Sequence, residues 1–109
     1  MIPAPFEYVS ATSVDDIVQS LAEHGDDAKV LAGGHSLLPL MKLRFAVPSV
    51  VVDIGRVDEL LGVTDEGSHL SIGAGTTHHD VMHHPLVRQH AGLLAEATSM
   101  VGDAQVRHR

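Results

Sequence analysis

The chain has 109 residues, of which 44% are hydrophobic and 19% charged, and its formal net charge is −7. This size predicts one domain or part of one, and the composition favours a folded core over disorder. The acidic charge excludes a nucleic-acid surface, no apolar run reaches the roughly 18 residues of a membrane span, and the absence of cysteine excludes disulfides.

The first half of the chain predicts strands alternating with helices. Ser13 is a natural N-cap for a helix that carries an apolar stripe and stops at Gly25. Residues 49–54 are β-branched and almost continuously apolar, which is typical of a central strand buried on both faces. The predicted elements are an edge strand at 6–9, a helix after Ser13, a strand at 28–32, a short helix at 37–43 with Pro39 in its first turn, and the central strand at 49–54.

The second half predicts a hairpin followed by helices. Asp65-Glu66-Gly67 has a turn composition between strands at 60–64 and 70–74. A second glycine turn at 73–78 then leads into helices at 77–83 and 86–98, interrupted by Pro85, and residues 101–109 form a short polar tail. The order of elements predicts an α/β (or α+β) fold.

A glycine pair, Gly33-Gly34, directly follows the strand at 28–32. Adjacent glycines adopt positive φ without steric cost, and successive N–H groups in such a turn form a concave site for phosphate oxygens. Next come His35, with a ring that can hydrogen-bond or stack, and Ser36, with a hydroxyl that can cap the next turn or bind phosphate. The pattern is equally typical of an ordinary connection between a strand and a helix.

Three segments in order resemble the FAD-binding (medium) subunit of molybdenum hydroxylases, and most of all the medium subunit of aerobic carbon monoxide dehydrogenases. The first is Ala32-Gly33-Gly34-His35-Ser36 with the apolar run after it, similar to that family's first flavin loop. The others are the turn at 72–78, and 101–109, which resembles a D-P-Q-V-R segment with Ala104 where proline is usual. The opening residues 1–8 also resemble the start of that family's sequences.

The resemblance implies the N-terminal subdomain of a PCMH-type FAD-binding domain, with a small mixed sheet and flanking helices. In the family a Gly-Thr-Ile-Gly-Gly turn follows at once, whereas this sequence stops at Arg109. We therefore expect residues 1–109 to be an N-terminal fragment without the second subdomain and the C-terminal domain. Such a fragment is expected to be inactive alone and to self-associate through its exposed interdomain surface.

The implied cofactor is FAD, and no catalytic side chain is assigned. The backbone N–H groups of residues 32–36 would bind its pyrophosphate, Leu31 and Leu37 would line the cleft, and Val101 and Gly102 would approach the flavin ring. The expected cofactor-binding residues are therefore Leu31, Ala32, Gly33, Gly34, His35, Ser36, Leu37, Val101 and Gly102.

The implied function is an oxidoreductase subunit that relays electrons from iron–sulfur clusters through FAD to an acceptor. Its expected partners are a molybdopterin-containing large subunit and an iron–sulfur small subunit. The N-terminus lacks the features of a signal peptide, so a cytoplasmic location is expected. Two alternatives stay open, namely a non-enzymatic α/β interaction module and a fragment that binds nucleotide phosphates without flavin.

Histidines form the other cluster, in the pattern His-His-x-x-x-His-His from His78 to His84. His79 and His83 are four residues apart and share a helix face, a spacing that can bind zinc. The segment offers no clear third and fourth ligand, and histidine near a helix C-terminus is favoured by the dipole in any case. We therefore assign no metal site.

Overall fold

The computed structural model describes residues 2–108. Met1 and Arg109, which belong to the segments that resemble the flavin subunits, lie outside the described residues. The chain divides into two compact units, the first at 1–58 and the second at 59–109. No helix within residues 2–108 has both the length and the apolar character needed to cross a membrane.

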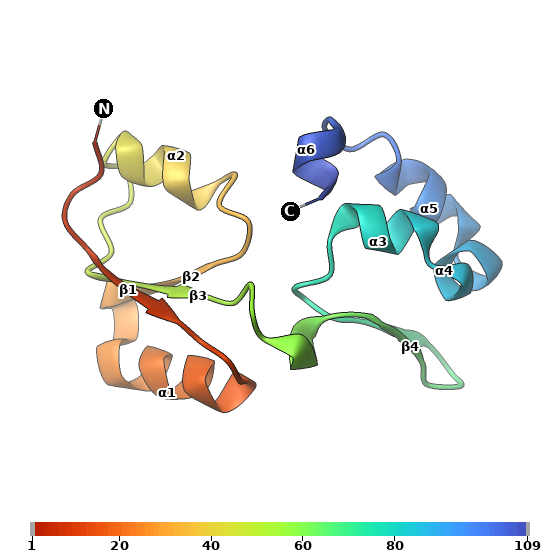
Figure 1. The fold of residues 1–109 in the computed structure, drawn as a ribbon, viewed down its shortest axis with the longest axis horizontal. Coiled ribbons are helices and arrows are strands. Elements are labelled where there is room, and N and C mark those ends of the chain that lie inside the picture. Colours follow the sequence, from red (N-terminus) through yellow and green to blue (C-terminus); the bar gives the residue numbers. More distant parts are fainter. Residues whose placement is uncertain (1, 109) are drawn as a thin grey trace. The chain divides into compact units, whose positions relative to one another are not determined.

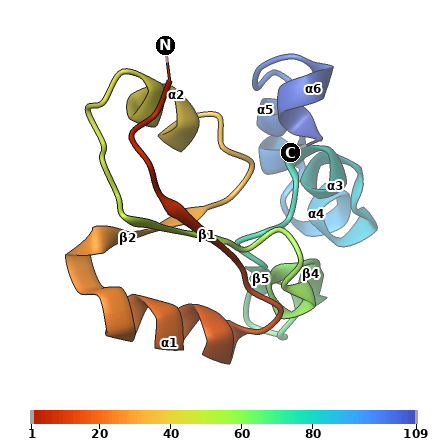
Figure 2. The ribbon, with the colours of Figure 1, turned by 60° about the vertical axis from the view of Figure 1, so that its left-hand side comes forward.

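The first unit is built on a three-stranded parallel sheet. Its strands are β1 (Glu7–Ser10), β2 (Ala28–Leu31) and β3 (Val50–Asp53), in the order β1-β3-β2. Val51 and Val52 of the central strand are 0% exposed, because β1 and β2 flank this strand and both faces of the sheet are covered. Helices α1 (Val14–His24) and α2 (Leu37–Lys42) lie on opposite faces of this sheet (Figures 1 and 2). The predicted edge strand and buried central strand are both confirmed.

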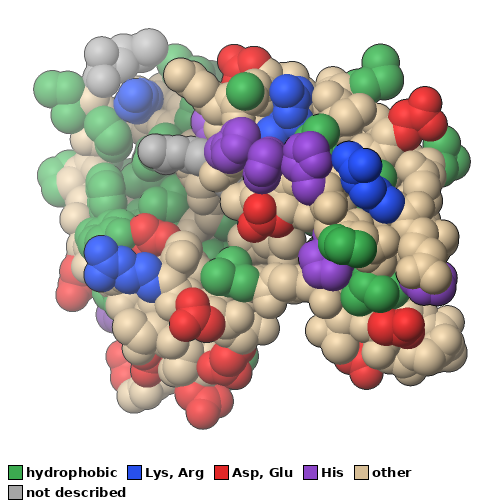
Figure 3. Space-filling view, turned by 45° about the vertical axis from the view of Figure 1, so that its right-hand side comes forward, with side chains coloured by type: hydrophobic (Ala, Val, Ile, Leu, Met, Phe, Trp, Pro, Cys, Tyr) green, Lys and Arg blue, Asp and Glu red, His purple; other side chains and the backbone are tan. Residues whose placement is uncertain are grey.

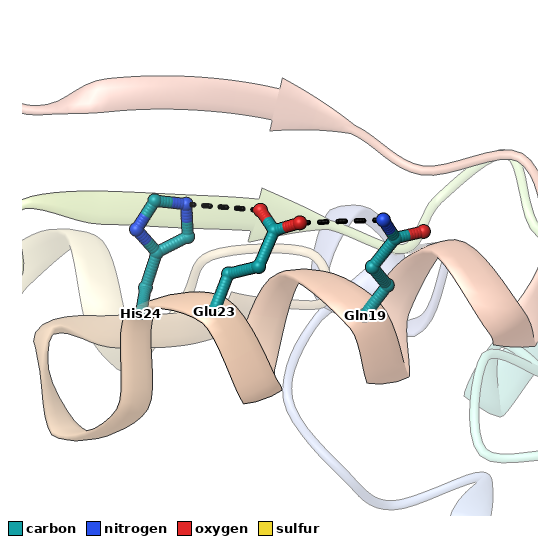
Figure 4. A network of polar contacts seen from close by, with 3 residues as sticks. All are labelled: Gln19, Glu23 and His24. Carbon is teal, nitrogen blue, oxygen red and sulfur yellow. Dashed lines mark hydrogen bonds and ion pairs between the residues drawn. The ribbon is translucent and has the colours of Figure 1, made fainter.

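Helix α1 begins and ends as its sequence predicts. The Ser13 hydroxyl accepts a hydrogen bond from the Asp16 N–H at 3.1 Å, and Gly25 follows the helix with φ 56°. Ile17 is buried against the sheet side, whereas Gln19, Glu23 and His24 form a chain of polar contacts along the surface (Figure 4). Exposed contacts of this kind add little stability, so the buried face holds the helix in place.

The second unit holds an antiparallel hairpin and four short helices. Strands β4 (Val63–Asp65) and β5 (Leu70–Ile72) form the hairpin, followed by α3 (His78–His83), α4 (Pro85–His90), α5 (Gly92–Thr98) and α6 (Ala104–Arg107). Val81, Val87 and Ala95 form a buried cluster among these helices. The α/β class is confirmed, with the parallel and antiparallel strand pairs in separate small sheets.

Two helix predictions need correction. The expected helix at 86–98 is broken at Ala91, whose φ of −141° and ψ of 53° leave the helical region, so that α4 ends and α5 begins at Gly92. The break turns the chain and brings Val87 and Ala95 into one cluster. The tail, for which only a short polar segment is expected, contains α6, because the Asp103 carboxylate caps this helix by accepting from the Val106 N–H at 3.0 Å.

Replacing Met41 tests how α2 is held. Met41 is 2% exposed, whereas its neighbour Leu40 is 43% exposed on the same helix. Met41→Ala is expected to lower the free energy of unfolding by about 2–5 kcal/mol, because it leaves a cavity. The matched Leu40→Ala is expected to cost less than about 1 kcal/mol. Urea denaturation measures both, and equal losses would contradict this packing.

Candidate cofactor-binding site

The predicted flavin loop joins β2 to α2 through two residues with left-handed backbones. Gly33 has φ 75° and Gly34 has φ 86°. Side chains are strained in this region, so the turn requires glycine at both positions. The turn follows directly after Leu31, whose carbonyl accepts the Ile54 N–H at 3.1 Å, and it therefore lies at the carboxyl end of the parallel sheet.

Gly34 is also buried beneath neighbouring side chains. A Cβ built at this position lies 2.7 Å from Cδ1 of Leu38 and 3.4 Å from Cδ1 of Leu31. A residue with a side chain would therefore have to move Leu38 as well as adopt a positive φ. The glycine keeps the turn tight against the start of α2.

The turn presents a row of backbone donors. The carbonyls of Gly34 and Ser36 accept from Leu38 and Leu40 at 3.1 and 3.3 Å. The N–H groups of Gly34, His35 and Ser36, in contrast, donate to no other described residue. The side chains of His35 and Ser36 are exposed. Three successive N–H groups beside a hydroxyl are the donors that phosphate oxygens require.

One of the two roles expected for Ser36 is wrong. The residue precedes α2 but makes no side-chain capping hydrogen bond. Its φ of −105° and ψ of −49° are already helical, whereas a capping residue adopts an extended backbone from which the hydroxyl can reach back. The hydroxyl is therefore not used by the helix, and its role in binding phosphate stays a prediction.

The remaining predicted residues divide between the two units. Leu31 and Leu37 are half-buried and Ala32 is exposed in the first unit, beside the turn. Val101 and Gly102 belong to the second unit, and Gly102 has φ 58°. The Arg107 Nη1 donates to the carbonyls of Val101 and Gly102, at 3.3 and 2.9 Å, so two hydrogen bonds connect this turn to α6. The role of Val101 and Gly102 at the flavin ring stays a prediction.

The second glycine turn has a structural explanation within its own unit. A Cβ on Gly73 would lie 2.1 Å from the carbonyl oxygen of Leu60, and the Gly75 N–H donates to that same oxygen at 2.8 Å. The Thr76 hydroxyl bonds both the N–H and the carbonyl of Gly62. Close packing of two backbone segments therefore accounts for these glycines without a ligand.

The histidine cluster does not converge on a metal position. His79 and His83 share a face of α3, with ring centroids 4.6 Å apart. The Nδ1 atom of His84 is used as the N-cap of α4, where it accepts from the Leu86 N–H at 3.2 Å. Among residues 2–108 no group of three or more histidine or carboxylate side chains is arranged to hold a metal ion.

Comparison with known proteins gives the class to which this fold and turn belong. The family described as "FAD binding domain in molybdopterin dehydrogenase" matches residues 4–109. This chain belongs to that family, and its cofactor is FAD. The donor set fits the group, because uncharged amides at a glycine turn can surround a diphosphate.

The individual relatives are chains or subunits of dehydrogenases. The carbon monoxide dehydrogenase medium chain of Hydrogenophaga pseudoflava is 51% identical over 109 residues, which are 100% of this chain and 38% of the relative. The 6-hydroxypseudooxynicotine dehydrogenase complex subunit alpha of Paenarthrobacter nicotinovorans is 39% identical over 109 residues, or 100% of this chain and 37% of the relative. This chain therefore spans little more than a third of their length.

Solved structures agree with the sequence comparison. Carbon monoxide dehydrogenase from Hydrogenophaga pseudoflava, lacking the Mo-pyranopterin moiety of its cofactor, matches with a TM-score of 0.94 at 51% identity, over 100% of this chain and 38% of that one. Quinoline 2-oxidoreductase from Pseudomonas putida 86 matches with a TM-score of 0.93 at 35% identity, again over 100% and 38%.

Substitution of Gly73 tests the packing of the second turn. Gly73→Ala is expected to destabilise the second unit by about 1–3 kcal/mol, because the new methyl group meets a backbone carbonyl that has little room to move. Gly92→Ala is the matched control, since a Cβ there meets nothing within 4 Å. Thermal unfolding measures both variants, and a neutral Gly73→Ala would contradict the close approach.

Proposed function

We propose that this chain is the FAD-binding part of a molybdenum hydroxylase flavin subunit similar to a carbon monoxide dehydrogenase medium chain. Its task is to hold the FAD diphosphate on the backbone of residues 32–36. The observation that carries the proposal is that the N–H groups of Gly34, His35 and Ser36 have no partner among residues 2–108, in a chain of an FAD-binding family. The alternatives of an interaction module and of a flavin-free phosphate site become outcomes of the test below.

The residues of the turn act by position rather than by charge. Gly33 and Gly34 give the backbone its left-handed bend, and successive N–H groups in such a turn can form a concave site for phosphate oxygens. The Ser36 hydroxyl adds a further donor, and the exposed His35 ring lies beside it. Leu31 and Leu37 supply apolar surface on either side of the turn. No residue here is a general base or nucleophile.

Bound FAD supplies electron-transfer chemistry, and the protein fixes where it takes place. The relatives named above are dehydrogenase subunits, which supports an oxidoreductase role for the protein that contains this chain. We propose that it receives electrons from iron–sulfur clusters of a small subunit, which a molybdopterin-containing large subunit reduces, and passes them to an acceptor in the cytoplasm.

Residues 1–109 correspond to only part of such a subunit. We propose that they are the N-terminal part of a PCMH-type FAD-binding domain, whose second subdomain and C-terminal domain account for the remaining length of the relatives. This proposal is supported by a match over the whole chain that covers 38% of the relative. Alone, the part is expected to hold the diphosphate weakly and to have no dehydrogenase activity.

Binding of FAD to the purified chain tests the proposal. Gly34→Val is expected to weaken the binding of FAD at least about tenfold. The reason is that a side chain at this positive φ meets Leu38 and shifts the backbone N–H groups away from the diphosphate. Ser36→Ala is expected to have a smaller effect, since it removes one hydroxyl and leaves the backbone donors in place. Amide chemical shifts in NMR titrations measure both.

Ligand comparison separates the alternatives. ADP, which carries the diphosphate, is expected to compete with FAD, whereas riboflavin, which lacks it, is not. Equal binding of ADP and FAD would favour a phosphate site that does not use flavin, and no binding of either would favour an interaction module. Unchanged FAD affinity in Gly34→Val, with Gly92→Ala as the folded control, would contradict the assignment of the turn.

A further inference from the structure

Three imidazole rings meet in the second unit. His79 and His83 lie on α3, and His108 follows α6. The rings of His79 and His108 are stacked, with centroids 4.0 Å apart and planes 25° from parallel, and the ring centroid of His83 lies 4.6 Å from that of His79. Histidine side chains gather on this face of the molecule (Figure 3). His79 is half-buried.

Hydrogen bonds hold the two outer rings in place. The Nδ1 atom of His108 lies 2.6 Å from the carbonyl oxygen of Ala104 and donates to it, because a carbonyl only accepts. The Nδ1 atom of His83 accepts from Nη2 of Arg88 at 3.4 Å, because a guanidinium only donates. The stack therefore joins α3 to α6, with the His108 ring oriented by Ala104 of α6 and the His83 ring oriented by Arg88 of α4.

The groups around His79 disfavour a positive charge on it. Loss of water contact is the main cause that lowers the pKa of His79, followed by the neighbouring His108 and His83 rings and the Arg107 guanidinium, while Asp80 acts in the opposite direction. The other charged side chains on helices packed against α3 are Arg88 of α4, which contacts His83, and Glu96 of α5.

We propose that the stacked rings of His79 and His108 form a pH-sensitive clasp, which holds α6 against α3 at neutral pH and releases it in mildly acidic solution. Two neutral rings stack favourably, whereas a proton on His79 places a cation against His108, His83 and Arg107. The turn at Val101 and Gly102 is released together with α6, because Arg107 bonds both carbonyls. The proposal is independent of FAD.

The direction of the pH dependence follows from the lowered pKa. A released His79 binds a proton more readily than a stacked one, so acid favours release. The stabilisation that the clasp gives to α6 is complete above pH 6.5, the ordinary pKa of histidine. It is lost as the pH falls through the lower pKa of the stacked His79 ring.

NMR on the 109-residue chain tests the clasp. At pH 7.5 we expect nuclear Overhauser effects between the ring protons of His79 and His108, and helical amide shifts for residues 104–107. At pH 5.5 we expect the ring contacts to be lost and these amide shifts to move to those of an unfolded segment, while the shifts of Val81 and Val87 stay unchanged. Ring contacts that persist at pH 5.5 would overturn the proposal.

Substitutions isolate the titrating ring. His79→Phe keeps an aromatic ring without a titratable proton, so its contact with His108 and the helical shifts of α6 are expected at both pH values. His90→Phe, whose ring has no ring contact within the described part of the chain, is expected to behave as the unmodified protein. Release of α6 at pH 5.5 in His79→Phe would overturn the proposal.

Discussion

The constraint on which the candidate site depends is the left-handed backbone of two consecutive residues. Gly33 and Gly34 reverse the chain at the end of β2, and the reversal leaves the next N–H groups without partners in the described residues. Any side chain at Gly34 would meet Leu38 as well as an unfavourable φ. The buried sheet beneath, with Val51 and Val52 fully covered, gives the turn a rigid base.

The second unit uses similar residue types for a different purpose. Gly73 and Gly75 let one backbone segment approach another at Leu60, and Thr77 and Asp103 cap the helices that follow them. A glycine turn in sequence is therefore not by itself a ligand site. What distinguishes this turn is that the N–H groups of Gly34, His35 and Ser36 have no partner among the described residues, whereas the Gly73 and Gly75 N–H groups are both bonded to backbone carbonyls.

Local chemistry made much of the fold predictable. The Ser13 cap, the stop at Gly25 and the apolar run of β3 are each encoded by neighbouring residues, and the motifs identified the family. The break at Ala91 and helix α6 were missed, because they depend on which side chains reach a common core and on a cap formed after the chain has turned. The contact of Gly73 with Leu60 joins segments distant in sequence, so no local pattern reveals it. For Ser36, the sequence left two roles open and the backbone conformation removed one.

The central claim is that the diphosphate of FAD is held by backbone N–H groups of this turn. A crystal structure of the chain with FAD tests it most directly. We expect diphosphate oxygens within about 2.7–3.2 Å of the backbone nitrogens of Gly34, His35 and Ser36. A diphosphate bound elsewhere, with the turn unchanged and its donors facing solvent, would contradict the account.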